Sequence, residues 1–377
     1  MSRAGGGPGD GTRTILIFVS FSGQGGVERM ILNLARGLVA RGHGVRLVLA
    51  RADGGWLDHL PAGVEVERLG TRHTLTAVIS LARYLRRHRP PLLLVAKDRA
   101  IKAAILARAL AGVEVRLVGR LGTNASAALA GRGRVKRALW HAGMRRFYGR
   151  LDGLVTVSQG VKDDVVAITG MDPRTIRVIP NPVITPDLAH AARRPAGHPW
   201  ADDKDLPLII AVGRLTRQKD FPTLLRAFAR VAVECPARLV ILGEGSDRGG
   251  LLALAAELGI GDRVALPGFQ GNPHAWVAAA DLFVLSSLWE GSPNALTEAM
   301  ALGVPVVATD CPSGPSELLQ GGRVAPLVAP RDVEGLAAAM ARVLAAPPDP
   351  ELLRGAVAAY TMEKSAASYL RFFDELA

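Results

Sequence analysis

The chain has 377 residues, enough for two domains of ordinary size, and 49% of them are hydrophobic, which is compatible with large cores. No apolar run approaches the roughly 18 residues of a membrane-spanning helix, and the Gly-rich residues 1–13 lack the apolar core of a signal peptide. We therefore expect a disordered tip on a cytoplasmic protein. The two cysteines, Cys235 and Cys311, have no metal-ligand spacing and give no disulfide framework.

The positive charge of the chain lies in its first half. The formal net charge is +12, but residues 1–190 contain 29 Lys and Arg against 13 Asp and Glu, which gives +16. Residues 191–377 contain 17 against 21, which gives −4. This asymmetry indicates an anionic partner for the first half. A nucleic acid is not expected, because no recognised nucleic-acid-binding motif accompanies the charge.

Strands and helices alternate along residues 14–185. The first buried run, TILIFVS at 14–20, precedes a glycine-rich loop and apolar residues at helical spacing from Val27 to Leu38. This alternation predicts an N-terminal domain in which helices cover both faces of a parallel sheet. The further strand candidates of this domain are 45–50, 92–96, 115–119, 153–157 and 176–179.

A Pro-rich, acidic stretch at 186–206 is typical of a linker, and the alternation then resumes over 207–350. Asp203 and Asp205 in this stretch have the spacing of a metal-binding pair, but their linker-like surroundings favour a solvated loop. The sequence therefore predicts an α/β protein of two Rossmann-like, doubly wound domains that face each other across a cleft. Helices are expected at 351–377, and the sequence leaves open whether they cross back to the first domain. The strand candidates of the second domain are 208–213, 238–243, 263–266, 281–285 and 305–308.

Two carboxylates flank a predicted helix start in the second domain. The segment 286–305, SSLWEGSPNALTEAMALGVP, follows one apolar run and precedes another, so Glu290 lies in a turn and Glu298 lies within the helix. Carboxylates in these places suit the hydroxyls of a ligand. The alternative is that Glu298 is a surface helix residue and that Glu290 is a loop charge.

The start of that helix predicts an anion site. Ser292 suits the N-cap and Pro293 suits the first helical position, where no amide hydrogen is needed. The amides of Asn294 and Ala295 then point outward at the positive end of the helix dipole, which suits phosphate or other polar oxygens. A nucleotide sugar has both a diphosphate and many hydroxyls, so it fits both parts of this segment.

A glycine-rich loop, GQGGVER, separates the first strand from the first helix. Gly25 and Gly26 let a backbone approach a phosphate or a sugar closely, although their spacing matches neither a dinucleotide-binding motif nor a phosphate loop. No acidic residue ends the strand at 45–50, where a dinucleotide ribose would need one. A nicotinamide cofactor, and with it an oxidoreductase, is therefore not expected.

Two loops of the second domain are further candidates. Arg214 and Lys219 in GRLTRQK can hold phosphate oxygens, unless they form only a solvated basic loop. The turn at 266–269, which contains Gly268, follows a strand and is either part of a nucleobase slot or an ordinary tight turn.

Five motifs occur in order along the chain: GGVER, VIPNPV, AVGRLTRQKDFPTLLRAF, LVILGEGS and SLWEGSPNALTEAMALGVPVVATD. With them the chain resembles family 4 of the retaining glycosyltransferases, which have the GT-B fold, over nearly its whole length. The resemblance implies transfer of a sugar from a nucleotide-diphosphate donor to a saccharide or polyprenyl-diphosphate-linked acceptor. It implies no cofactor beyond the nucleotide sugar as co-substrate.

The resemblance also implies roles for individual residues, with Arg214, Lys219 and Glu290 as the catalytic candidates. Arg214, Lys219 and the helix N-terminus would stabilise the departing diphosphate, so no metal ion is required. By this resemblance, Arg214 and Lys219 would bind the diphosphate, and Gly25 and Gly26 would cap it from the first domain. Glu290 and the amides of Asn294 and Ala295 would contact the transferred sugar. Glu298 would bind the ribose, and Gly268 would lie near the base.

The chain departs from the family pattern in two places. Many relatives have a His after the strand matched here by 115–119, where this chain has RLGTN, so Arg120 and Asn124 are only acceptor-side candidates. The first Glu is followed by GSPN rather than the common Gly-Phe-Gly. This EGxPN form resembles a subset that often uses uridine-diphosphate sugars, commonly hexosamines or galactose, on polysaccharide or lipid-linked acceptors.

Residues 131–150, GRGRVKRALWHAGMRRFYGR, carry seven basic and no acidic side chains. The apolar side chains between them predict an interfacial helix that binds an anionic membrane surface, and the alternative is an ordinary helix buried on one side. We therefore expect a peripheral enzyme at the inner face of the cell membrane that acts in cell-surface glycan synthesis. The alternative function is a non-catalytic basic membrane-binding protein on a degenerate GT-B scaffold. The apolar residues are Val135, Leu139, Trp140, Met144, Phe147 and Tyr148.

Overall fold

The structure is a computed structural model that describes residues 13–22, 26–53, 60–71, 76–203 and 205–376. Gly25 and residues 1–12 of the expected disordered tip lie outside the described residues.

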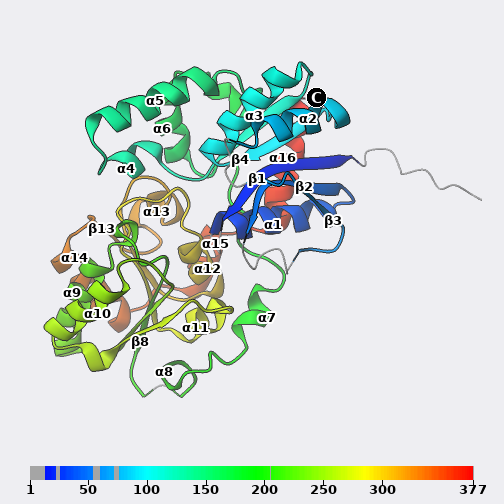
Figure 1. Ribbon diagram of the computed structural model, residues 1–377. Coiled ribbons are helices and arrows are strands. Elements are labelled where there is room, and N and C mark those ends of the chain that lie inside the picture. Colours follow the sequence, from blue (N-terminus) through cyan, green and yellow to red (C-terminus); the bar gives the residue numbers. More distant parts are fainter. Residues whose placement is uncertain (1–12, 23–25, 54–59, 72–75, 204, 377) are drawn as a thin grey trace, which may run out of the picture.

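The first domain is built on a parallel sheet of seven strands in the order β3-β2-β1-β4-β5-β6-β7. Helices cover both faces of this sheet (Figure 1), so its central strands are apolar on both sides. The strands are β1 (Thr14–Ser22), β2 (Gly44–Asp53), β3 (Val64–Arg68), β4 (Leu92–Ala96), β5 (Arg116–Leu121), β6 (Gly153–Thr156) and β7 (Ile176–Val178). The helices are α1 (Gly26–Val39), α2 (Val78–His88), α3 (Asp98–Ala111), α4 (Ala125–Leu129), α5 (Arg134–Tyr148) and α6 (Gln159–Thr169).

The second domain repeats this architecture with a six-stranded parallel sheet in the order β10-β9-β8-β11-β12-β13. Its strands are β8 (Leu208–Val212), β9 (Arg238–Leu242), β10 (Val264–Gly268), β11 (Leu282–Leu285), β12 (Val306–Thr309) and β13 (Leu327–Val328). The helices from the connection onward are α7 (Leu188–Ala192), α8 (Pro199–Asp202), α9 (Phe221–Glu234), α10 (Arg248–Glu257), α11 (Pro273–Ala279), α12 (Asn294–Leu302), α13 (Pro315–Leu318), α14 (Val333–Ala345), α15 (Pro350–Ala356) and α16 (Met362–Glu375).

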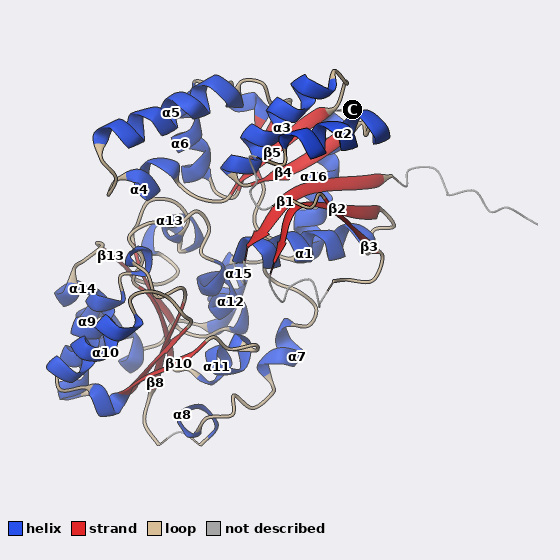
Figure 2. Cartoon of the chain, in the orientation of Figure 1, coloured by secondary structure: helices blue, strands red, loops and turns tan. Residues whose placement is uncertain are grey.

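The predicted α/β architecture of two doubly wound domains is confirmed, and the two sheets lie in separate bodies that face each other (Figure 2). The sequence missed β3 and β13. β3 is an edge strand whose side chains are mostly exposed, so it has no buried apolar run, and β13 has only two residues. The expected linker at 186–206 contains two short helices, α7 and α8.

The last helix of the chain packs against the first domain. Tyr369, Phe372 and Phe373 of α16 lie in the core on one face of the first sheet, and α16 contacts α1. The preceding helix, α15, contacts α12 of the second domain. The chain therefore crosses between the domains twice, and the two crossings are paired by a bridge between Ile184 and Thr361.

Phe373→Ala should destabilise the first domain although the residue lies near the end of the chain. The ring is almost fully buried, and loss of such a ring costs about 3–5 kcal/mol. Hydrogen exchange should show lost protection in β1 and α1, while β8 and α9 keep theirs. Arg371→Ala, an exposed position on the same helix, is the control and should change neither. Lost protection in β8 instead would contradict the assignment of α16 to the first domain.

Candidate functional site

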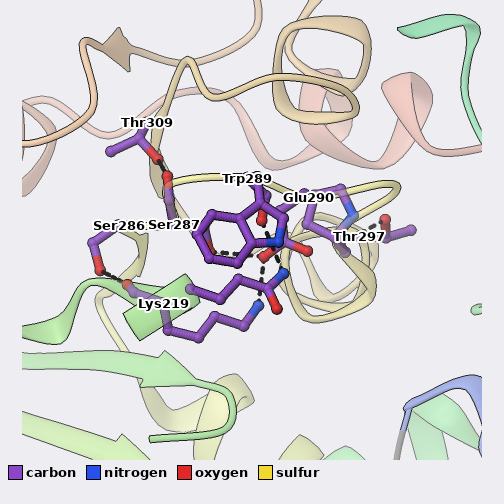
Figure 3. Close-up of polar contacts among 9 residues, drawn as sticks. Lys219, Ser286, Ser287, Trp289, Glu290, Thr297 and Thr309 are labelled. Carbon is purple, nitrogen blue, oxygen red and sulfur yellow. Dashed lines mark hydrogen bonds and ion pairs between the residues drawn. The ribbon is translucent and has the colours of Figure 1, made fainter. Parts of the chain in front are cut away.

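Glu290 and Lys219 meet where two neighbouring strands of the second sheet end. Glu290 follows β11 and is buried, and its Oε1 accepts hydrogen bonds from Lys219 Nζ at 2.5 Å and from Ser287 Oγ at 2.7 Å (Figure 3). Lys219 follows β8, which pairs with β11, so the sheet brings the two side chains together. A carboxylate at this depth needs a cation, because an unpaired buried charge is costly.

Hydrogen bonds between loops hold this pair in place. Ser286 Oγ donates to the Lys219 carbonyl at 2.7 Å (Figure 3). Gln218 Nε2 donates to the Trp289 carbonyl at 2.9 Å. The stem of Lys219 passes over Gly213, where a Cβ would lie 2.7 Å from Lys219 Cε. The position of the ammonium group is therefore fixed by both backbone and side-chain contacts.

Helix α12 begins one residue later than the sequence predicts. Pro293, not Ser292, is the N-cap: its backbone is extended (φ −77°, ψ 94°), and its carbonyl accepts from the Thr297 amide at 3.1 Å. The hydroxyl of Ser292 caps nothing and is buried without a hydrogen-bond partner. The amides of Asn294 and Ala295 still occupy the first turn, where no intrahelical carbonyl is available to them.

Glu298 lies within α12 and is only 3% exposed. Its Oε1 forms an ion pair with Arg29 of α1, in the first domain, and its Oε2 lies 3.7 Å from His274 Nε2 of α11. Burial alone would raise the pKa of this carboxyl, but the charge of Arg29 and the contact with His274 outweigh burial and hold the pKa below its ordinary value. Glu298 is therefore ionised at neutral pH, and neither it nor Glu290 is a surface charge.

The two acceptor-side candidates make contacts at the domain boundary. Arg120 is 3% exposed and donates to Asn181 Oδ1 at 2.5 Å, and Asn181 Nδ2 donates to Asn294 Oδ1 at 2.8 Å. Asn124 accepts from an amide of α4 as its N-cap, and its Nδ2 donates to Ser313 Oγ of the second domain at 2.9 Å. Asn124 thus links the domains directly and Arg120 does so through Asn181, and a role toward an acceptor stays a prediction.

The remaining predicted residues lie at the rim of the same region. Arg214 is exposed in the loop after β8. Gly26 begins α1 and faces α12, because a Cβ on it would lie 3.6 Å from Asn294 Nδ2. Gly268 ends β10 at φ +86°, a backbone conformation that favours glycine.

Residues that the sequence did not single out complete the boundary. Arg29 lies in the GGVER motif and Asn181 in VIPNPV, but neither motif indicates the partner of the residue. The Glu317 carboxylate accepts from the amides of Gln159 and Gly160 at 2.8 and 2.9 Å, at the N-terminus of α6 in the other domain. A cavity of about 440 Å³ opens beside this contact, between α6 and residues 310–317.

No group of three or more His, Cys, Asp or Glu side chains within the described ranges is placed to hold a metal ion. The cations that the structure brings to the two buried carboxylates are Lys219 and Arg29.

Two family models match the chain. Residues 24–186 match the model described as Glycosyltransferase Family 4, and residues 206–346 match the model described as Glycosyl transferases group 1. The two matched segments correspond to the two domains and together cover more than half of the chain. The chain belongs to the family 4 glycosyltransferases, with the GT-B fold.

Individual relatives agree with this family. The chain is 26% identical, over 86% of its length and 87% of the relative's, to the lipopolysaccharide core biosynthesis glycosyltransferase LpsE of Rhizobium meliloti. It is 34% identical to the N-acetylgalactosamine-N,N'-diacetylbacillosaminyl-diphospho-undecaprenol 4-alpha-N-acetylgalactosaminyltransferase of Campylobacter jejuni, but that alignment covers only 45% of each protein. The structure of Anabaena Alr3699/HepE in complex with UDP and glucose superposes with a TM-score of 0.77 at 19% identity, over 96% of this chain and 99% of that one.

The two thiols of the glycosyltransferase should differ in reactivity. Burial, reinforced by the charge of Glu290, raises the pKa of the Cys311 thiol to about 12, whereas Cys235 is partly exposed. Because the thiolate is the reactive form, native protein treated with iodoacetamide at pH 8 should be modified at Cys235 and not at Cys311. Unfolded protein, in which both thiols should react, is the control, and rapid native modification of Cys311 would contradict the buried site.

Proposed function

We propose that the chain is a retaining glycosyltransferase that moves a sugar from a uridine-diphosphate donor to a saccharide or lipid-linked saccharide. The observation that carries this proposal is the pair of buried carboxylates, Glu290 and Glu298, on either side of the free N-terminus of α12. A helix N-terminus attracts a diphosphate, and buried carboxylates bind hydroxyls. A nucleotide sugar presents these groups in the same order, as sugar, diphosphate and ribose.

The donor would bind to the second domain. The diphosphate would meet the amides of Asn294 and Ala295, with Lys219 and the exposed Arg214 supplying positive charge. Glu290 would hold hydroxyls of the transferred sugar, and Glu298 would hold the ribose. The 2.5 Å contact between Lys219 and Glu290 supports this order, because the ammonium group would then lie between the sugar and the diphosphate.

In the proposed reaction, the bond between the sugar C1 and the diphosphate oxygen breaks with an oxocarbenium-like transition state. The acceptor hydroxyl forms a new bond to C1 on the same face, and its proton passes to an oxygen of the departing diphosphate. Lys219, Arg214 and the helix N-terminus stabilise the charge that develops on the diphosphate, so the proposed reaction needs no metal ion. Closure of the two domains excludes water and thereby limits hydrolysis.

The substrate class follows from the EGSPN sequence and from the relatives. The names of those proteins include transfer of N-acetylgalactosamine to a diphospho-undecaprenol saccharide, lipopolysaccharide core synthesis and a complex with UDP and glucose. We therefore propose a UDP-hexose or UDP-N-acetylhexosamine donor and a role in cell-surface glycan synthesis.

Helix α5 is the proposed membrane contact. None of the helices in the described part of the chain is long and apolar enough to cross a membrane. Of the six apolar residues predicted to face a membrane, Met144 and Tyr148 are buried in the core, and Trp140 and Phe147 pack against it. The two that remain exposed are Val135 at 72% and Leu139 at 68%, and basic side chains surround them. This basic and apolar surface fits the inner face of the cell membrane.

Nucleotide-sugar binding tests the donor site. With chelator present, a UDP-sugar at 100 times its dissociation constant should stabilise the protein by about 2.7 kcal/mol, which a thermal shift detects. Glu298→Ala should weaken this binding, and Arg214→Ala and Lys219→Ala should abolish transfer. Arg217→Ala, at an exposed basic residue of the same loop, is the control. Unchanged turnover in all three variants would contradict the site, and membrane binding without affinity for any nucleotide sugar would favour the non-catalytic alternative.

Vesicle sedimentation tests the membrane contact. The variant Val135→Glu/Leu139→Glu should lose most binding to vesicles that contain anionic lipid, and raised salt should weaken the wild-type protein. Val233→Glu, at an exposed apolar residue of α9 in the other domain, is the matched control. Equal binding of the double variant and the wild-type protein would exclude α5 as the docking surface.

A further inference from the structure

The ion pair between Arg29 and Glu298 crosses the domain boundary. Arg29 lies in the first turn of α1, immediately after the glycine-rich loop, and Glu298 lies in α12 of the second domain. The Glu298 side chain is 4% exposed and the Arg29 side chain is 23% exposed, so the contact is largely shielded from water. Removing one partner of such a pair is costly, because it leaves the other charge shielded from water without a counter-charge.

The positive charge that is always present beside Glu298 is that of Arg29, which belongs to the other domain. In the described part of the chain, the titratable groups that face this carboxylate are Arg29 of α1 and His274 of α11. His274 is charged only if protonated, whereas an arginine is always charged in a protein. Glu298 therefore keeps a full positive charge beside it only while α1 stays against α12.

Among the described residues, none is within hydrogen-bond distance of the second carboxylate oxygen of Glu298. Arg29 occupies Oε1, and His274 Nε2 lies 3.7 Å from Oε2, which is beyond hydrogen-bond distance. An ionised carboxylate accepts at both oxygens, so Oε2 can accept a hydrogen bond from a hydroxyl of a ligand. A guanidinium bound at Oε1 restricts rotation of the carboxylate and thus the directions in which Oε2 can point.

We infer that Arg29 is a positioning residue for the donor ribose: it reaches across the cleft and holds Glu298 oriented, with Oε2 free for a ribose hydroxyl, only in the closed enzyme. This inference rests on the proposed function, in which Glu298 binds the ribose. It goes further because it makes the ribose site depend on a charged side chain of the first domain. Donor binding and domain closure then favour each other, since each provides a partner for the same carboxylate.

The test is a double-mutant cycle with Arg29→Gln, Glu298→Gln and the two together. Binding of a UDP-sugar is measured by titration, and KM and kcat are measured for the donor. Arg29→Gln should weaken donor binding and raise KM about 10- to 100-fold, as expected for loss of a charged hydrogen bond in a shielded site. The double variant should be no weaker than Glu298→Gln alone, because both changes remove the same interaction. Arg29→Lys should recover part of the affinity.

The matched control is Arg36→Gln. Arg36 lies on the same helix and forms an ion pair with Asp187, in the connection between the domains. The side chains of both residues are exposed. Exposed pairs contribute little, so this variant should bind the donor like the wild-type protein.

The pH profile of donor binding gives a readout that loss of structure alone would not produce. In the wild-type protein, Arg29 and His274 lower the pKa of Glu298 against the effect of burial. Without Arg29, the effect of burial is less offset and the pKa of Glu298 rises. On acidification, donor binding should therefore be lost at a higher pH in Arg29→Gln than in the wild-type protein. Repeating the profile in His274→Gln separates titration of the histidine from titration of the carboxyl.

The outcomes separate the inference from the proposed function. If Glu298→Gln binds the donor like the wild-type protein, the ribose site itself is wrong and the proposed donor site falls with it. If Glu298→Gln weakens binding but Arg29→Gln and Arg29→Lys do not, the donor site stands and the inference is overturned. A melting temperature for each variant shows that it is folded, and where Arg29→Gln does not fold, failure of Arg29→Lys to alter KM or the pH profile overturns the inference.

Discussion

Two carboxylates are buried in the second domain of this protein, and burying a negative charge without a partner cation is costly. The structure meets this requirement in two ways. Glu290 is paired with Lys219 from a neighbouring loop of the same domain, whereas Glu298 is paired with Arg29 from the other domain. The first pair is complete in the second domain alone, and the second exists only when the domains are together. The site therefore has one part that is built into a rigid sheet edge and one part that depends on domain position.

The close approach of the domains is possible because small residues line the boundary. A Cβ on Gly291 would lie 2.3 Å from the carbonyl oxygen of Gly122, so a side chain there would push the domains apart. Asn124 and Ser313 are hydrogen-bonded beside this contact, and Glu317 accepts from the first amides of α6. Together these contacts hold the domains in the relative position that the structure has, and the ion pair of Glu298 lies beside them.

The sequence predicted those parts of the fold and site that depend on local pattern. Long buried runs gave the central strands, and the turn and helix around Glu290 gave a candidate anion site. Local pattern could not find β3, because an edge strand has little buried surface, or show that α5 buries Met144 and Tyr148 and exposes Val135 and Leu139. It also could not pair Arg29 with Glu298, because 269 residues separate them and their contact depends on how two independently folded sheets meet.

The packing of α16 has a consequence for the synthesis of the chain. The core of the first domain includes aromatic rings from residues 369–373, which the ribosome adds more than 180 residues after β7 has completed the first sheet. While the second domain is being made, the face of the first sheet that α16 covers has no partner of its own. Domains generally fold as units in the order of synthesis, but here the first to be translated is the last to be completed. The apolar face left open in that interval is a natural target for a chaperone or for aggregation.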